Sequence, residues 1–199
     1  MSLPVSYFDE MYRETDDPWG FRSRWYEARK RAVVLASLQS ERYPSIFEPG
    51  CSIGTLTADL AGRADRILAM DVSSRALETA AASVPGHVEL RQGGVPGDWP
   101  SGEFDLVVMS EVAYYLDTGG CEEVAALAVG SAAELVVVHW RHPVSDYPLG
   151  GDEVHALFGA AARRQGLEHL LSHVEPDFRV DSWCRDHRSV AVRAGLVGR

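Results

Sequence analysis

One stretch, residues 46–73, constrains the fold of this chain more than any other. It begins with an apolar run ending in Glu48, passes through a glycine-bearing turn at residues 49–54 into a helical pattern, and closes with a second apolar run ending in Asp71. This order predicts a strand, a tight loop, a helix and a strand, with an acid at the carboxyl end of each strand. In a doubly wound sheet such strand ends are neighbours, and ligands bind in the crevice beyond them.

The spacing of the loop narrows the kind of ligand. A chain that turns sharply from strand to helix needs a positive φ or a close backbone approach, and glycine at positions 50 and 54 permits both. Asp71 suits a ribose diol, because a carboxylate can accept hydrogen bonds from both hydroxyls. The pattern E-x-G-x-S-x-G differs from the dinucleotide pattern G-x-G-x-x-G, and no Gly-Lys-Ser/Thr follows as in a phosphate-binding P-loop. An ordinary strand–turn–helix with incidental glycines is the alternative interpretation of the loop alone.

The loop resembles motif I of the class I S-adenosylmethionine (SAM) methyltransferases, in which an acidic residue leads a G-x-G-x-G-like turn. Ser52 stands at the middle small position. The resemblance implies that Gly50 and Gly54 lie under the methionine part of SAM and that Asp71 binds the ribose. Glu48 and Ser52 join them as candidate cofactor-binding residues. The expected cofactor is SAM, and the expected product is S-adenosylhomocysteine (SAH).

Two short N-terminal segments, residues 17–21 (DPWGF) and 25–27 (WYE), narrow the resemblance. They resemble the nodulation protein S (NodS)-like branch, whose members N-methylate an amino sugar of a chitooligosaccharide. The resemblance implies that Trp19 and Tyr26 are lid aromatics near SAM and that Arg29 reaches the methionine carboxylate. Simple packing of the two aromatic residues stays open as the alternative.

The adenine end departs from the family pattern. Many relatives carry an aspartate that binds the adenine amino group, whereas Gly94 occupies that place here. Val72, Gly94 and Val95 are the candidate cofactor-binding residues on this side. Either the backbone around residues 94–95 reads the adenine edge, or adenine is bound more weakly.

Two further apolar runs, residues 103–111 and 134–140, read as buried parallel strands. The residues after the first run, Ser110, Glu111 and Tyr115, are expected beside the crevice. The resemblance implies that Ser110 faces the methyl donor there and that Glu111 and Tyr115 face the methyl acceptor. Glu111, or His142 at the end of the second run, is the candidate proton acceptor, and Tyr115 completes the catalytic candidates. A solvated or capping role for Glu111 and a structural role for the histidine are equally open. No third ligand is placed by spacing, so no metal site is predicted.

The strand–helix alternation predicts a single α/β domain over residues 1–199. We expect an N-terminal helical cap at 1–44 and a Rossmann-like core at 45–199, a doubly wound sheet. The resemblance implies seven strands in the order 3-2-1-4-5-7-6, with the last strand antiparallel. The last strands are expected at 167–174, 178–184 and 189–193, and a helix at 152–165 is expected to be capped by Asp152.

Composition excludes several classes of function. The net charge of −10 argues against nucleic acid as a partner, because a phosphate-binding face needs concentrated Lys and Arg. Three distant cysteines predict a reduced, cytoplasmic protein, and the lack of a long apolar run predicts no membrane span. The protein is expected to be a monomer or a homodimer, and the sequence does not distinguish the two. The expected activity is methyl transfer from SAM to a small-molecule or oligosaccharide acceptor, most simply the amine of an amino sugar. A small-molecule O-methyltransferase and a non-catalytic SAM-binding partner protein are the alternatives; glycine spacing disfavours a nicotinamide-dependent oxidoreductase.

Overall fold

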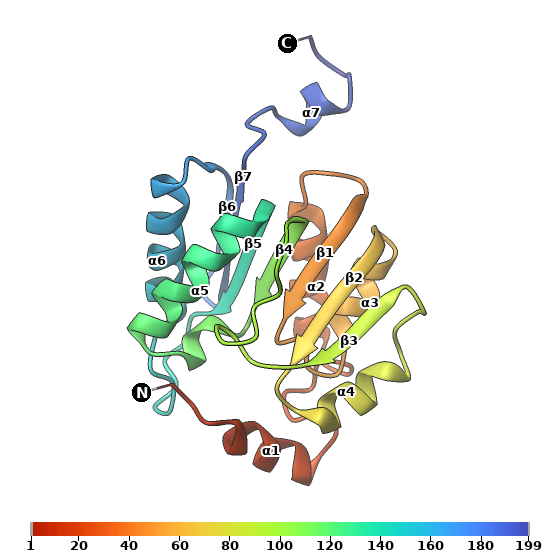
Figure 1. The fold of residues 1–199 in the computed structure, drawn as a ribbon, viewed down its shortest axis with the longest axis vertical. Helices are drawn as coiled ribbons and strands as arrows, with labels where there is room; N and C mark the ends of the chain where they lie inside the picture. The colour runs from red at the N-terminus through yellow and green to blue at the C-terminus, as the bar shows by residue number, and fades with distance from the viewer. Residues whose placement is uncertain (1, 199) are drawn as a thin grey trace.

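The computed structural model describes residues 2–198, which form one seven-stranded sheet in the order β3-β2-β1-β4-β5-β7-β6 (Figure 1). The strands are β1 (Tyr43–Pro49), β2 (Ala64–Asp71), β3 (Val88–Gln92), β4 (Phe104–Ser110), β5 (Ala132–Trp140), β6 (Glu168–Val174) and β7 (Phe178–Cys184). Strands β1 to β5 pair in parallel, and β7 is antiparallel to both β5 and β6. The predicted strand order and antiparallel last strand are confirmed.

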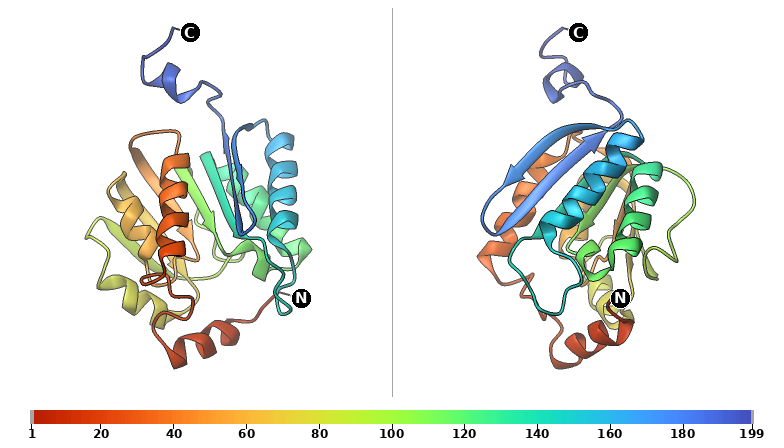
Figure 2. Two further views of the ribbon diagram at one scale, coloured as in Figure 1. Left: turned by 180° about the vertical axis from the view of Figure 1, so that it is seen from behind. Right: turned by 90° about the vertical axis from the view of Figure 1, so that its left-hand side faces the viewer.

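Helices cover both faces of the sheet (Figure 2). They are α1 (Val5–Glu14), α2 (Trp25–Ser37), α3 (Thr55–Ala61), α4 (Ser74–Ala81), the 3-10 turn η1 (Ala113–Tyr115), α5 (Thr118–Ser131), α6 (Gly151–Arg164) and α7 (Val190–Arg193). Residues of α2 and α3 share one buried cluster with the sheet, and residues of α5 and α6 share the other. Successive side chains of β4 alternate between them: Leu106 and Val108 enter the first, Val107 and Met109 the second. Because both faces are covered, the strand reads as a continuous apolar run.

The N-terminal region divides into two parts. Helix α1 and the loop after it run along the edge of the molecule where the parallel strands end (Figure 1). Helix α2 instead packs in the layer of α3 and also contacts β5 and β7. Of the expected cap at residues 1–44, the segment that lies across the strand ends is therefore α1 with its following loop.

Two local predictions were wrong. Residues 189–193 do not add a strand: Val190–Arg193 is the short helix α7, whose first turn is capped by the Ser189 hydroxyl accepting from the Val192 N–H at 3.3 Å. Asp152 does not cap α6 either, because the N-cap is Gly150 and Asp152 pairs with Arg141. Between residues 2 and 198, no helix is long and apolar enough to cross a membrane.

Candidate active site

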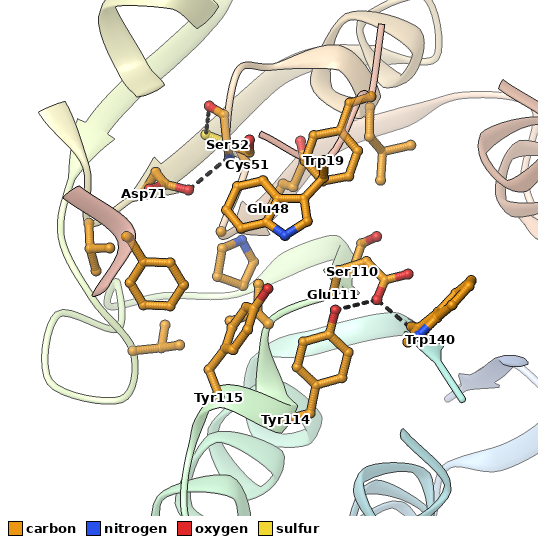
Figure 3. Close-up of a pocket in the computed structure, with 18 of the residues that line it drawn as sticks. Trp19, Glu48, Cys51, Ser52, Asp71, Ser110, Glu111, Tyr114, Tyr115 and Trp140 are labelled. Atoms are coloured by element: carbon orange, nitrogen blue, oxygen red, sulfur yellow. Dashed lines mark hydrogen bonds between the residues drawn. The ribbon is translucent and has the colours of Figure 1, made fainter. Parts of the chain in front are cut away.

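A cavity of about 650 Å³ lies beyond the carboxyl ends of β1, β2 and β4. This is the position at which doubly wound sheets bind ligands, and the volume is that of a small-molecule site. The predicted site residues that line it are Trp19, Glu48, Gly50, Ser52, Asp71, Val72, Gly94, Val95, Ser110, Glu111 and Tyr115. In Figure 3 the Ser52–Asp71 group and the Glu111–Tyr114–Trp140 group occupy opposite sides of the cavity.

The glycine loop is bent in the way the sequence predicts. Gly50 and Gly54 have φ values of +69° and +75°. A Cβ at Gly50 would overlap the Val112 side chain, so this position requires glycine for both its conformation and its close approach. Gly54 lies behind the loop, where a Cβ would press on Ala80 of α4, and it is not among the residues that line the cavity. Gly54 therefore shapes the loop from behind.

Asp71 holds the loop together. Its Oδ2 accepts the Ser52 N–H at 2.8 Å, and its Oδ1 accepts the Ser73 N–H at 2.9 Å. Each oxygen keeps a further lone pair for a ligand hydroxyl. Ser52 has a left-handed backbone, with φ of +51°, and its hydroxyl is hydrogen-bonded to the Tyr12 hydroxyl. This bond ties α1 to the loop.

Glu48 is a buried carboxylate with spare bonding capacity. It is 2% exposed, and its Oε2 has no hydrogen-bond partner among the described residues. Burial raises the pKa of Glu48 to about 8; the neighbouring Thr57 hydroxyl lowers this pKa and the charge of Asp71 raises it. Because Glu48 also lines the cavity, a cationic group of a ligand bound there would compensate the burial of its carboxylate.

Val72, Gly94 and Val95, which were expected on the adenine side, all line the cavity. The Gly94 N–H donates to Asp98 Oδ2, and the Gly94 carbonyl accepts the Asp98 N–H, both at 2.9 Å. The Gly94 backbone is therefore already hydrogen-bonded, which weighs against Gly94 itself reading the adenine edge; that the Val95 backbone does so stays a prediction.

Glu111 stands at the centre of the opposite side. It accepts hydrogen bonds from the Tyr114 hydroxyl at 2.6 Å and from the Trp140 N–H at 3.0 Å (Figure 3). It also accepts a hydrogen bond from Lys30 Nζ at 2.7 Å. Its φ of +58° is left-handed. For a residue other than glycine, such a conformation costs on the order of 1–3 kcal/mol, and it tends to occur at functional sites.

Besides Gly54, which was expected to lie under the methionine part of SAM, two predicted site residues do not line the cavity. Arg29 points away from the cavity and makes a bidentate ion pair with Glu175, at 2.6 and 2.9 Å. His142 is exposed, with its Nε2 2.8 Å from Asp177 Oδ1. Neither is among the residues that line the cavity, so the structure supports neither the carboxylate-binding role of Arg29 nor the proton-acceptor role of His142.

Sequence reasoning missed Glu27 and Lys30, which line the cavity and pair with each other at 3.0 Å. In the sequence they look like an ordinary exposed i,i+3 pair of a helix. The available signal is that Lys30 is the only lysine in the chain. Burial favours arginine for ion pairs in general, so a single buried lysine indicates a position with a specific requirement.

Comparison with known proteins identifies the family. The model of nodulation protein S (NodS) matches residues 9–129. Nodulation protein S of Bradyrhizobium diazoefficiens is 28% identical over 173 residues, which cover 79% of this chain and 80% of that protein. Nodulation protein S of Rhizobium tropici is 31% identical over 104 residues, 51% of this chain; the match spans only 44% of that relative's length.

Solved structures agree on the fold. A Pseudomonas syringae protein assigned as a methyltransferase is 41% identical, with a TM-score of 0.69 over 80% of this chain and 99% of that one. The N-methyltransferase NodS of Bradyrhizobium japonicum WM9, in complex with SAH, is 23% identical, with a TM-score of 0.78 over 88% of this chain and 96% of that one. Because the family model covers more than half of the sequence, the chain belongs to the nodulation protein S family of class I SAM-dependent methyltransferases.

Proposed function

We propose that the protein transfers the methyl group of SAM to the amine of a small polar acceptor, an amino sugar or a glycan-derived compound. The observation that carries the proposal is the single cavity that joins the Asp71 side to the Glu111 side. The Bradyrhizobium japonicum relative is an N-methyltransferase, and this kinship supports nitrogen as the methylated atom.

The residues on the Asp71 side of the cavity fit SAM. Glu48 lines the cavity and offers its buried carboxylate to the α-ammonium of the methionine part. Asp71 retains lone pairs for the ribose hydroxyls, and Val72 and Val95 give the base an apolar wall. When bound, SAM supplies an electrophilic methyl group on a sulfonium. The protein then has to orient the acceptor and exclude water, and such orientation contributes about 7–11 kcal/mol in ideal intramolecular models.

The residues on the Glu111 side of the cavity favour an amine over a hydroxyl as the methyl acceptor. An amine needs only to be neutral when it attacks, and a carboxylate can take its proton, whereas a hydroxyl needs a stronger base. Carboxylates are present in Glu27 and Glu111, and among the described residues that line the cavity there is no histidine. The alternative of an O-methyltransferase therefore lacks its expected base.

The test is methyl transfer from isotopically labelled SAM to D-glucosamine and to deacetylated chitobiose, with N-acetylglucosamine as the amine-blocked control. We expect mass spectrometry to place the label on nitrogen and the N-acetylated control to stay unlabelled. Label on the blocked sugar would instead indicate O-methylation. SAH binding without transfer to any of these acceptors would support the non-catalytic partner protein.

A further inference from the structure

Three charged side chains form a buried group in the wall of the cavity. Lys30 Nζ lies 3.0 Å from Glu27 Oε2 and 2.7 Å from Glu111 Oε1. The side chains of Lys30, Glu27 and Glu111 are only 7%, 10% and 11% exposed. All three line the cavity on the side opposite the glycine loop. This charged trio therefore faces whatever occupies the acceptor end.

The trio carries a net negative charge when all three groups are ionised, since two carboxylates meet one ammonium. A buried charge without a counter-charge is unfavourable. The neighbouring cation Arg31 is already engaged, with its Nε 2.7 Å from Asp59 Oδ2 and its Nη1 donating to the Phe21 carbonyl. A cationic acceptor would bring the trio to neutrality, so the electrostatics favour an acceptor that arrives as an ammonium.

The two carboxylates are not equivalent. Glu111 is occupied by three donors, from Lys30, Tyr114 and the Trp140 backbone. Glu27 accepts only from Lys30 and keeps free lone pairs. Burial raises the pKa of Glu27, with Lys30 acting in the opposite direction and Glu111 in the same one. Glu27 is thus the more available base, and Glu111 is the anchor that fixes Lys30.

Tyr26 adds a polar group beside the trio. Its hydroxyl is buried and has no partner among the described residues, although the ring lines the cavity. Lys30 Nζ lies 5.4 Å from the centroid of this ring, and Trp140 packs edge-on against it at 5.5 Å. A hydroxyl held in this way is free to bond a second polar group of the acceptor, such as a hydroxyl next to the amine.

We propose that Glu27 accepts a proton from the acceptor ammonium, while Lys30 and Glu111 act as positioning residues. This inference rests on the proposed function. Glu27 takes one proton from R–NH₃⁺ and becomes a neutral acid, which leaves R–NH₂. The nitrogen lone pair forms the N–C bond to the methyl group as the C–S bond breaks, and that electron pair stays on sulfur. The product leaves as R–NH₂⁺–CH₃, and Glu27 returns its proton to solvent.

The first test does not require turnover. In protein carrying ¹³C-labelled glutamate and loaded with SAH, the Glu27 carboxyl signal is assigned by its loss in Glu27→Gln. We expect it to titrate above the ordinary glutamate value of about 4.3 and to move to lower pH when D-glucosamine is added, because an ammonium favours the carboxylate. A signal that titrates in the ordinary range and ignores glucosamine would overturn the proposal.

The second test compares kinetics. Glu27→Gln should lower kcat/KM for D-glucosamine by about 10²–10⁴-fold and remove the acidic limb of its pH profile. SAH affinity and Tm should stay as in the wild type, and the exposed Glu122→Gln is the matched control. If the wild type methylates the amine and Glu27→Gln does so equally, with an unchanged pH profile, this inference fails and the proposed function stands. If the wild type methylates no amine, the proposed function itself fails.

Discussion

Acidification should weaken SAH binding through Glu48. The pKa of about 8 means that half of the Glu48 carboxyl groups are ionised at pH 8 and only about 1% at pH 6. The α-ammonium of the ligand favours the carboxylate and therefore competes with the proton. If binding requires ionised Glu48, the affinity for SAH should fall about 50-fold between pH 8 and pH 6, or by about 2.3 kcal/mol. The affinity for SAH rises with pH, because Glu48 of the ligand-free folded protein loses its proton only near pH 8.

Calorimetric titration with SAH at pH 6, 7 and 8 measures this slope. Glu48→Gln keeps the shape of the side chain but has no ionisable carboxyl group. The affinity of this variant for SAH should therefore be weak and nearly independent of pH. The exposed Glu122→Gln should retain the wild-type slope. The reasoning is refuted if wild-type affinity changes less than twofold over this range, or if Glu48→Gln shows the same slope.

Three other perturbations have defined outcomes. Gly50→Ala forces a Cβ into Val112 at a positive φ, so unfolding by urea should show a loss of about 1–3 kcal/mol together with weaker SAH binding; unchanged values would contradict the steric argument. Asp71→Asn removes a charged acceptor while keeping its volume, and calorimetry should show SAH affinity reduced by roughly 10–150-fold with the circular dichroism spectrum preserved. Burial holds the pKa of His139 well below its ordinary value, and that of His155 below it, so the unfolded chain binds more protons below about pH 6.5. Burial of Glu48 acts in the opposite direction, so the effect is read as a difference: between pH 7.5 and 5.5 the free energy of unfolding of the wild type should fall by up to about 1.4 kcal/mol more than that of His139→Gln, and equal pH dependence of the two proteins would rule the effect out.

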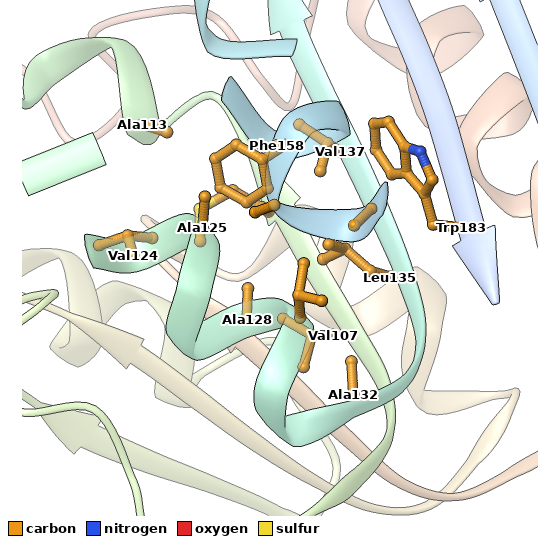
Figure 4. Packing of buried hydrophobic residues seen from close by; sticks show 14 of the residues in the cluster. Val107, Ala113, Val124, Ala125, Ala128, Ala132, Leu135, Val137, Phe158 and Trp183 are labelled. Carbon is orange, nitrogen blue, oxygen red and sulfur yellow. The ribbon is translucent and has the colours of Figure 1, made fainter. Parts of the chain in front are cut away.

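Strands β4 and β5 could be predicted from their composition because they are covered on both sides, whereas the strand order was implied by the family resemblance. Val107 of β4 and both Leu135 and Val137 of β5 pack with Phe158 of α6 in the cluster between the sheet and the α5–α6 layer (Figure 4). A strand buried on both faces is apolar along its whole length, so residues 103–111 and 134–140 are recognisable without any partner. Residues 189–193 have the same apolar content, but they follow the last paired strand and form a helix instead. Local composition does not distinguish these outcomes.

The acceptor side was harder to predict, because the rotation of α2 decides which charges enter the cavity. Arg29, Lys30 and Arg31 are consecutive, and successive residues of a helix point about 100° apart. Lys30 enters the cavity, while Arg29 turns towards Glu175. An apolar stripe fixes the rotation of a helix, but this segment interleaves charged and apolar residues. The prediction that Arg29 reaches the methionine carboxylate failed because the sequence leaves the rotation of this helix undetermined.

The strained positions explain why the N-terminal helices belong to the site itself. Ser52 and Glu111 are the two residues other than glycine with a left-handed backbone among residues 2–198, and they lie at the ends of β1 and β4, on opposite sides of the cavity. Strain of this kind persists only where surrounding contacts hold it. The hydroxyl of Ser52 is held by Tyr12 of α1, and the carboxylate of Glu111 is held by Lys30 of α2. Each side of the cavity therefore depends on a contact from the N-terminal region, with α1 supporting the glycine loop and α2 supporting Glu111.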